Sequence, residues 1–262
     1  MTLTETAVLA GTGFLSGLMN SIAGGGSFLA FPVLMFLGLL PINANATSTV
    51  ALWPGTLSTM IAYHQELWLQ KKRLPVLITL SIIGGAAGAI TVLHISNDSF
   101  IRVVPYLLLI ATLMFTFRPQ IINWIRARAH RSDEEVSVSQ LFIFFTFCLA
   151  FILSVYNGFF GAGFGIMMLA ALGLMGMHHM HEMNAVRSCC GLVSNTVALI
   201  IFIVSGLVSW PHVFFMAGGA VIGGYGGAKM ARTMPPDHVR RMVIILGWGM
   251  TTYFFWKLFT GK

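Results

Sequence analysis

The stretch Asn20–Pro32, NSIAGGGSFLAFP, places three consecutive glycines inside a segment that has no Lys, Arg, Asp or Glu from Thr6 to Gln65. Glycine in a helix interior costs about 1 kcal/mol relative to alanine, and lipid cannot hydrogen-bond the backbone that a glycine run exposes. An ordinary membrane-spanning helix would avoid such a run. We therefore expect the helix to break here, with the exposed backbone turned towards protein or water.

The composition is that of an integral membrane protein. Hydrophobic residues make up 56% of the 262 residues, charged residues 9%, and the mean hydropathy is +0.83. Outer-membrane barrel strands alternate in segments of about ten residues. The uncharged apolar blocks of this chain are longer, which predicts an all-α polytopic fold. The net charge of +7 does not indicate nucleic-acid binding, because Lys and Arg cluster in short loops, as on cytoplasmic membrane faces.

The chain contains an internal repeat, whose landmarks recur in the same order after 137 to 139 positions. The aligned pairs are NSIAGGG from Asn20 with NGFFGAG from Asn157, GGAAGA from Gly84 with GGYGGA from Gly223, and DSFIR from Asp98 with DHVRR from Asp237. We expect an N-terminal repeat over residues 1–120, a cytoplasmic linker over 121–137 and a C-terminal repeat over 138–262.

The positive charges predict that the two repeats have opposite orientations. In the first half Lys71, Lys72 and Arg73 precede the Gly84 segment, whereas in the second half Lys229 and the arginines after it follow the equivalent segment. Short loops rich in Lys and Arg stay cytoplasmic, so equivalent helices cross the membrane in opposite directions. This inverted topology is common in secondary transporters, and it predicts that both termini are periplasmic.

Each half is expected to hold a broken or re-entrant helix pair followed by three transmembrane helices, ten elements in all. As one helix, the apolar block 139–175 would be about 55 Å long, against a hydrocarbon core of about 30 Å. It must therefore break, and the glycines from Asn157 mark the place. Length alone leaves open whether the short second members, near 27–40 and 164–175, cross fully or stop near the midplane.

The two breaks predict an anion site. A helix that restarts after a break presents unpaired N–H groups and the positive end of its dipole. Two such starts, one per half, would meet near the pseudo-two-fold axis. The glycines could instead serve only close helix packing. The candidate substrate-binding residues at the breaks are Asn20, Gly24, Gly25, Gly26, Ser27, Asn157, Gly161, Gly163 and Gly165.

The segment after each break also begins with polar residues. Arg187 is the sharpest candidate, because a cation at the edge of an uncharged segment has a guanidinium suited to sulfonate, carboxylate or phosphate oxygens. Its alternative role is to extend to the nearby cytoplasmic surface. The neutral candidates could bind a ligand or cap their own helices; they are Thr47, Ser48, Ser188 and Asn195.

Other motifs predict less. GGAAGA and GGYGGA are typical of a helix-packing face. His178, His179 and His181 could hold a metal, but nothing in the first half matches them, so we expect no resident metal. The chain lacks a phosphate-binding Gly-Lys-Ser/Thr ending and hydrolase motifs, so we expect neither a cofactor nor an enzyme.

GFLSGLMNSIAGGGSFLAFPVLMFLGLLPINANATSTVAL, together with NGFFGAGFGIMMLAALGL, resembles the TauE/SafE family of membrane permeases. The likeness covers nearly the whole chain and is strongest at the glycine cluster, Pro32 and Ala46-Thr47-Ser48. AVRSCC in the second half departs from the more usual run of small and hydroxyl residues. The resemblance implies export of small sulfur-containing anions, such as sulfite or organosulfonates, across a bacterial inner membrane.

The leading hypothesis is therefore a transporter for a small anion that works by alternating access. An inside-negative potential favours anion exit by about 2.3 kcal/mol per charge per 100 mV, so export needs no coupled ion. The alternatives are a metal-ion permease that uses the histidine loop and a membrane scaffold or sensor that transports nothing. The expected partners are the anion and the lipid bilayer, and a homodimer is compatible with the sequence.

Overall fold

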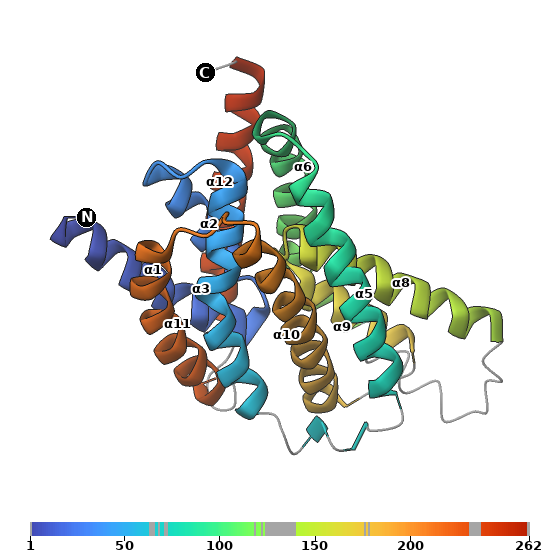
Figure 1. The fold of residues 1–262 in the computed structure, drawn as a ribbon. Helices are drawn as coiled ribbons and strands as arrows, with labels where there is room; N and C mark the ends of the chain where they lie inside the picture. The colour runs from blue at the N-terminus through green and yellow to red at the C-terminus, as the bar shows by residue number, and fades with distance from the viewer. Residues whose placement is uncertain are drawn as a thin grey trace.

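The computed structural model describes residues 2–62, 66–67, 69–70, 73–117, 119–121, 123, 140–175, 177, 179–230 and 237–260. Most of the predicted linker 121–137, and basic residues such as Lys71, Lys72 and Arg232, lie outside these ranges. The described residues form ten helices of ten or more residues (Figure 1), and this confirms the all-helical prediction. They are α1 (Leu3–Ala23), α2 (Ser27–Phe36), α3 (Pro41–Ala62), α5 (Leu74–Leu93), α6 (Asn97–Thr116), α8 (Gln140–Phe159), α9 (Phe164–Leu174), α10 (Met180–Val204), α11 (Trp210–Met230) and α12 (Asp237–Thr260).

Local sequence explains where several helices begin. Thr2 and Glu5 form a capping box at the start of α1, in which the Thr2 hydroxyl accepts from the Glu5 N–H at 3.2 Å and the Glu5 carboxylate accepts from the Thr2 N–H at 2.8 Å. Ser96 caps α6 with its hydroxyl, which accepts from the Ser99 N–H at 3.2 Å. Proline stands in the first turn of both α3 and α5, where its missing N–H costs nothing.

Both predicted helix breaks are present, between α1 and α2 and between α8 and α9. The helices after the breaks are short: α2 has 10 residues and α9 has 11. At 1.5 Å per residue these are about 15 and 17 Å long, roughly half of a 30 Å hydrocarbon core. By length alone, neither α2 nor α9 reaches across the whole hydrocarbon core.

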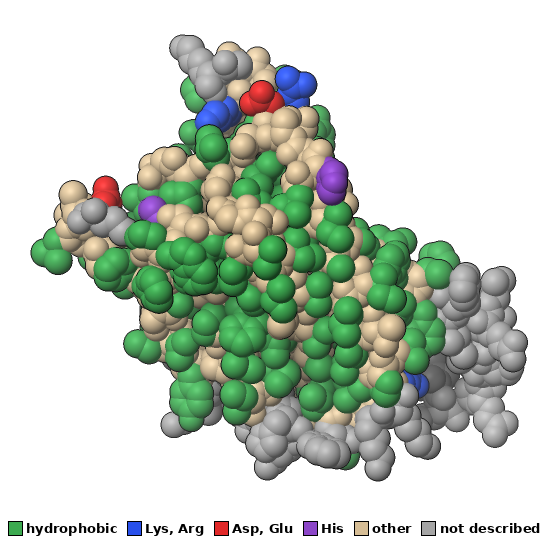
Figure 2. All heavy atoms as spheres, in the orientation of Figure 1, with side chains coloured by type: hydrophobic (Ala, Val, Ile, Leu, Met, Phe, Trp, Pro, Cys, Tyr) green, Lys and Arg blue, Asp and Glu red, His purple; other side chains and the backbone are tan. Residues whose placement is uncertain are grey.

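The surface and the helix lengths agree with a membrane setting. Three helices, Leu74–Leu93, Asn97–Thr116 and His181–Val204, are long and apolar enough to cross a membrane on length and composition. Large apolar side chains such as Phe214 and Ile222 are exposed. Figure 2 shows hydrophobic side chains over most of the visible face, with charged side chains near its ends.

Helices pack mainly on helices of the other half. The first helix of each half packs on the fourth helix of the other, α1 on α11 and α8 on α5 (Figure 1). The third helix of each half also packs on the fourth helix of the other half, α3 on α11 and α10 on α5. Glycines of both motifs allow these close approaches: a Cβ on Gly223 would lie 1.9 Å from the Phe14 carbonyl oxygen, and one on Gly88 would lie 2.1 Å from the Val155 carbonyl oxygen. The packing role predicted for both glycine motifs is confirmed.

Candidate functional site

The glycines at the two breaks adopt backbone conformations that other residues avoid. Gly24 ends α1 with φ +75°, and its N–H donates to the Asn20 carbonyl at 2.9 Å. In the second half Gly161 and Gly163 have φ +77° and +78°. Left-handed backbone is strained for residues that carry a Cβ. Glycine is therefore needed here for the turn itself.

The two breaks lie directly against each other. A Cβ on Gly24 would lie 2.7 Å from the Gly165 Cα and 2.6 Å from Nη1 of Arg187. Residues 141 positions apart in the sequence are thus in backbone contact, with a guanidinium beside them. This contact brings together the two points at which the sequence predicts an anion site.

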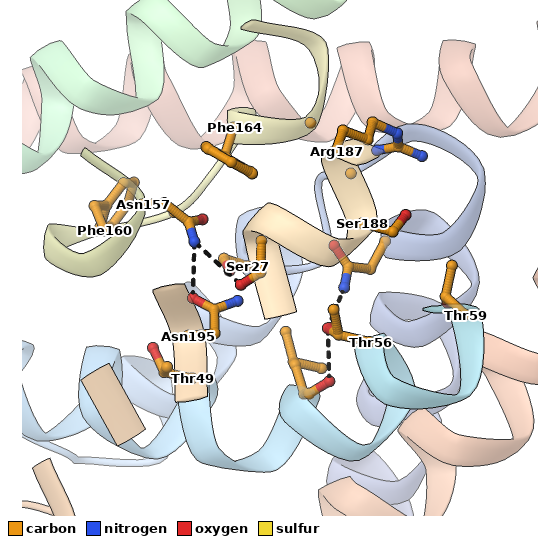
Figure 3. Close-up of a pocket in the computed structure, with 16 residues that line it drawn as sticks. Ser27, Thr49, Thr56, Thr59, Asn157, Phe160, Phe164, Arg187, Ser188 and Asn195 are labelled. Atoms are coloured by element: carbon orange, nitrogen blue, oxygen red, sulfur yellow. Dashed lines mark hydrogen bonds between the residues drawn. The ribbon is translucent and has the colours of Figure 1, made fainter. Parts of the chain in front are cut away.

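A small polar cavity lies at this contact (Figure 3). Its volume is about 50 Å³, which is room for a few waters at about 10–15 Å³ each. The walls come from both breaks and from the middle of α3 and the first half of α10. The lining residues are Asn20, Gly24, Ser27, Thr49, Leu52, Thr56, Thr59, Asn157, Phe160, Gly161, Phe164, Gly165, Arg187, Ser188, Gly191 and Asn195.

Arg187 is held firmly although it is almost fully buried. It is 5% exposed. Its Nε donates to Asn184 Oδ1 at 2.8 Å, and its Nη2 donates to the Ser21 carbonyl at 3.3 Å. The guanidinium therefore binds the end of α1 from α10 and at the same time lines the cavity. Its position inside the protein excludes the alternative role of extending to the membrane surface.

The end of α8 is held by a comparable contact from the other half, although its donor stands 139 positions before Asn184 and not before Arg187. Asn45 on α3 donates from Nδ2 to the Phe159 carbonyl at 2.9 Å. Each first helix is thus bound at its last turn by a side chain from the third helix of the opposite half. One donor is a neutral amide, and the other is a cation.

The asparagine before each break donates to the third helix of its own half, as the dashed lines in Figure 3 show. Asn20 Nδ2 donates to Thr56 Oγ1 at 2.8 Å. Asn157 Nδ2 donates to Asn195 Oδ1 at 3.1 Å. Thr56 and Asn195 are 139 positions apart, the same offset as the repeat landmarks. These bonds fix the breaks to the helices that form the cavity walls.

The start of the second helix in each pair faces this region without a side-chain cap. In the described residues, no side chain caps α2 at Gly26 or α9 at Gly163. In these first turns the Phe28 N–H donates to the Gly25 carbonyl at 3.1 Å and the Phe164 N–H to the Gly161 carbonyl at 3.2 Å, so the two starts offer an anion mainly the partial positive charge of the helix dipole. The cavity therefore combines a guanidinium, two helix starts and neutral polar side chains.

Nine of the predicted site residues line the cavity: Asn20, Gly24, Ser27, Asn157, Gly161, Gly165, Arg187, Ser188 and Asn195. Five others lie behind it. A Cβ on Gly25 would meet Phe115, one on Gly26 the Ser16 carbonyl, and one on Gly163 would meet Ala111. Thr47 accepts from the Ser209 N–H at 3.0 Å, and Ser48 donates to the Asn45 carbonyl at 2.9 Å.

The sequence patterns did not point to seven lining residues: Thr49, Leu52, Thr56, Thr59, Phe160, Phe164 and Gly191. The repeat offset could have found some of them, since Thr49 stands 139 positions before Ser188 and Thr56 the same distance before Asn195. Among the described residues no group of three metal-ligating side chains occurs. His178 of the histidine loop lies outside those residues.

Comparison with known proteins gives a consistent result. The family model described as "Sulfite exporter TauE/SafE" matches residues 9–254. A "Probable membrane transporter protein" of Haemophilus influenzae is 28% identical over 246 residues, which cover 94% of this chain and 92% of the relative. YfcA of Escherichia coli is 25% identical, over 88% of this chain and 82% of YfcA. YunE of Bacillus subtilis is also 25% identical, over 91% of this chain and 94% of YunE. Both bear the same description as membrane transporters, and no solved structure matches the chain.

Proposed function

Because the chain belongs to the sulfite exporter TauE/SafE family, we propose that this membrane protein transports small sulfur-containing oxyanions, such as sulfite or organosulfonates. The observation that carries the proposal is the buried guanidinium of Arg187 in a small polar cavity where two helix breaks meet. Guanidinium binds planar sets of oxygens well, and helix starts favour negative charge. A cavity of about 50 Å³ suits a few-atom anion rather than a large metabolite.

We propose alternating access by two repeats of inverted topology, spanning 1–120 and 138–262. The helix contacts support the inverted repeat, because each main contact between the halves recurs with the halves interchanged: α1 with α11 corresponds to α8 with α5, and α3 with α11 to α10 with α5. The paired donors to Ser21 and Phe159 support it as well. In this mechanism the repeats rock around the breaks, and the cavity opens to one side of the membrane at a time.

The direction we propose is export across a bacterial inner membrane, with both termini periplasmic. The relatives named above are bacterial proteins. Exit of an anion follows the inside-negative potential, so no coupled cation is required. The basic loops predicted to be cytoplasmic set this orientation.

The test is flux of sulfite and methanesulfonate from proteoliposomes. Loss of one charge-assisted hydrogen-bonding partner costs about 1.5–3 kcal/mol, so R187Q should lower flux at least roughly tenfold at subsaturating substrate. The matched control is R73Q, since Arg73 is exposed and donates to the Met175 carbonyl at 3.0 Å, outside the cavity. Equal flux in R187Q and the parent protein would refute the site.

The same assay separates the two alternatives. A metal-ion permease would carry divalent cations and would lose this activity when His179 and His181 are replaced. A scaffold or sensor would give no substrate-dependent flux in any variant. No observation on the described residues favours either one over anion transport.

A further inference from the structure

We propose that the cavity selects oxyanions that carry one negative charge, such as a sulfonate or hydrogensulfite, over doubly charged anions of similar size, such as sulfate. The inference rests on the proposed function, because it concerns the charge of the ion bound at that same site. Three features of the described cavity carry it: its side-chain charge, the balance of its helix ends, and the direction of its hydroxyl groups.

The side chains that line the cavity carry a single charge. Among the lining residues of the described chain, Arg187 is the one cation and none is acidic. The remaining polar side chains are neutral amides and hydroxyls. The described lining side chains therefore carry a formal charge of +1.

The helix ends add little net charge. A break brings together the start of one helix and the end of another, so α2 and α9 contribute partial positive charge while α1 and α8 contribute partial negative charge. One carbonyl at each of these ends accepts a side-chain hydrogen bond, Ser21 from Arg187 Nη2 and Phe159 from Asn45 Nδ2. The two breaks can orient an anion, but together they do not supply a second unit of charge.

The α3 wall is unsuited to a second negative charge. Its three lining threonines all donate their hydroxyl protons to backbone carbonyls of their own helix: Thr49 to Asn45 at 3.0 Å, Thr56 to Leu52 at 3.2 Å and Thr59 to Gly55 at 3.0 Å. These hydroxyls can therefore only accept from a ligand, and the Thr56 oxygen already accepts from Asn20 Nδ2 at 2.8 Å. They suit the neutral end of a ligand, either an organic substituent or an S–OH group that can donate.

The cavity is thus polarised across its width. Arg187 stands on α10, and the threonine oxygens stand on α3. A singly charged oxyanion would place its charged oxygens towards the guanidinium and its neutral end towards α3. A dianion would add negative charge beside those acceptor oxygens, while its cost of leaving water rises with the square of its charge.

The experiment compares methanesulfonate with sulfate, two tetrahedral sulfur anions of similar size that carry one and two charges at neutral pH. Their affinities for the purified full-length protein are measured by calorimetric titration at constant ionic strength, with melting temperature as a second readout. Methanesulfonate should bind at least tenfold more tightly than sulfate. R187Q should lose at least tenfold in methanesulfonate affinity, R187K should keep the order of the two anions, and R73Q should behave like the parent.

Sulfate stabilises folded proteins generally, without binding a specific site. The rise in melting temperature that sulfate causes in R187Q is therefore subtracted from the rise that it causes in the parent protein. Sulfate affinity equal to or above that of methanesulfonate, and dependent on Arg187, would overturn the charge selectivity while leaving oxyanion transport standing. Absence of binding by methanesulfonate, sulfite and sulfate alike would overturn the proposed function together with the inference.

Discussion

Gly24 is the residue on which the geometry of the site depends most directly. Its positive φ requires left-handed backbone, and its missing side chain lets the Gly165 backbone and the Arg187 guanidinium come together. A single methyl group on Gly24 would violate both requirements, the left-handed backbone and the close contact with Gly165 and Arg187. The residue therefore links the turn that ends α1 to the position of the cation.

We predict that G24A lowers the melting temperature and abolishes anion binding. Left-handed strain at a residue with a Cβ costs about 1–3 kcal/mol, and the new methyl group would displace Arg187 or Gly165. Melting in detergent and calorimetric titration measure the two effects. The matched control is G11A, since Gly11 stands in α1 and a methyl group there would have nothing within 4 Å. A G24A protein that binds methanesulfonate normally would contradict the assigned geometry.

At the residue scale, the sequence pointed to those lining residues that are unusual in a membrane helix and missed those that are common in one. Arg187 and the break glycines stand out because a membrane interior disfavours a cation and a flexible backbone. Thr56 and Thr59 stand in an ordinary helix, where hydroxyls usually bond their own carbonyls, and they do so here. Their place on the cavity wall follows from how α3 packs, which no local pattern encodes.

Among the elements, the two short helices after the breaks, α2 and α9, each contribute residues of their first turn to the cavity wall. The glycine runs predicted where each helix breaks, because a glycine destabilises the helix at its own position in the chain. The apolar blocks also predicted short second helices, near 27–40 and 164–175; α9 ends within one residue of that prediction, whereas α2 ends four residues earlier, at Phe36. These end points follow from where the chain next turns, at Gly38 with φ +92° in the first half and at Met175 in the second.

Helix packing on glycine faces gives a prediction for α11. Gly218 and Gly219 are neighbours in this helix, but a methyl group on Gly219 would lie 2.1 Å from the Ala10 carbonyl oxygen, whereas Gly218 has nothing within 4 Å. G219A should therefore push α1 away from α11 and destabilise the protein by about 1–3 kcal/mol. G218A should be neutral or stabilising by up to about 1 kcal/mol, because alanine favours helix.

Thermal melting of the two variants in the same detergent measures this difference. Because the substitutions are the same and adjacent, differences in expression or in detergent binding are minimised. Equal melting temperatures for G218A and G219A would show that the close α1–α11 contact contributes little to stability.

For the whole molecule, the proposed transport of a single negative charge predicts a response to voltage. With no coupled ion, an imposed potential of 100 mV should drive methanesulfonate to accumulate roughly fifty-fold on the positive side, since the potential is worth about 2.3 kcal/mol per charge. Proteoliposomes with a potassium diffusion potential measure this ratio. Accumulation that ignores the potential would instead indicate electroneutral exchange or coupling to a cation.

At this scale the sequence predicted the ten longer helices of the described residues and their order, because hydropathy and glycine landmarks repeat along the chain. It could not predict that the halves exchange partners. The pairing of α1 with α11 and of α8 with α5 depends on facing glycine surfaces. Each surface is visible in the sequence, but the sequence does not say which other surface it meets.

That exchange of partners has a consequence for biosynthesis. Helix α1 is synthesised first, whereas α11, which packs on it, begins only at Trp210. The Ser21 carbonyl likewise gains its bond from Arg187 only after residue 187 has been synthesised. During translation the first half therefore enters the bilayer with an unsealed groove and an unbonded turn, which water, lipid headgroups or an insertion chaperone must shield. The α1–α11 packing and the bond from Arg187 to the end of α1 can therefore form only after most of the chain has been made.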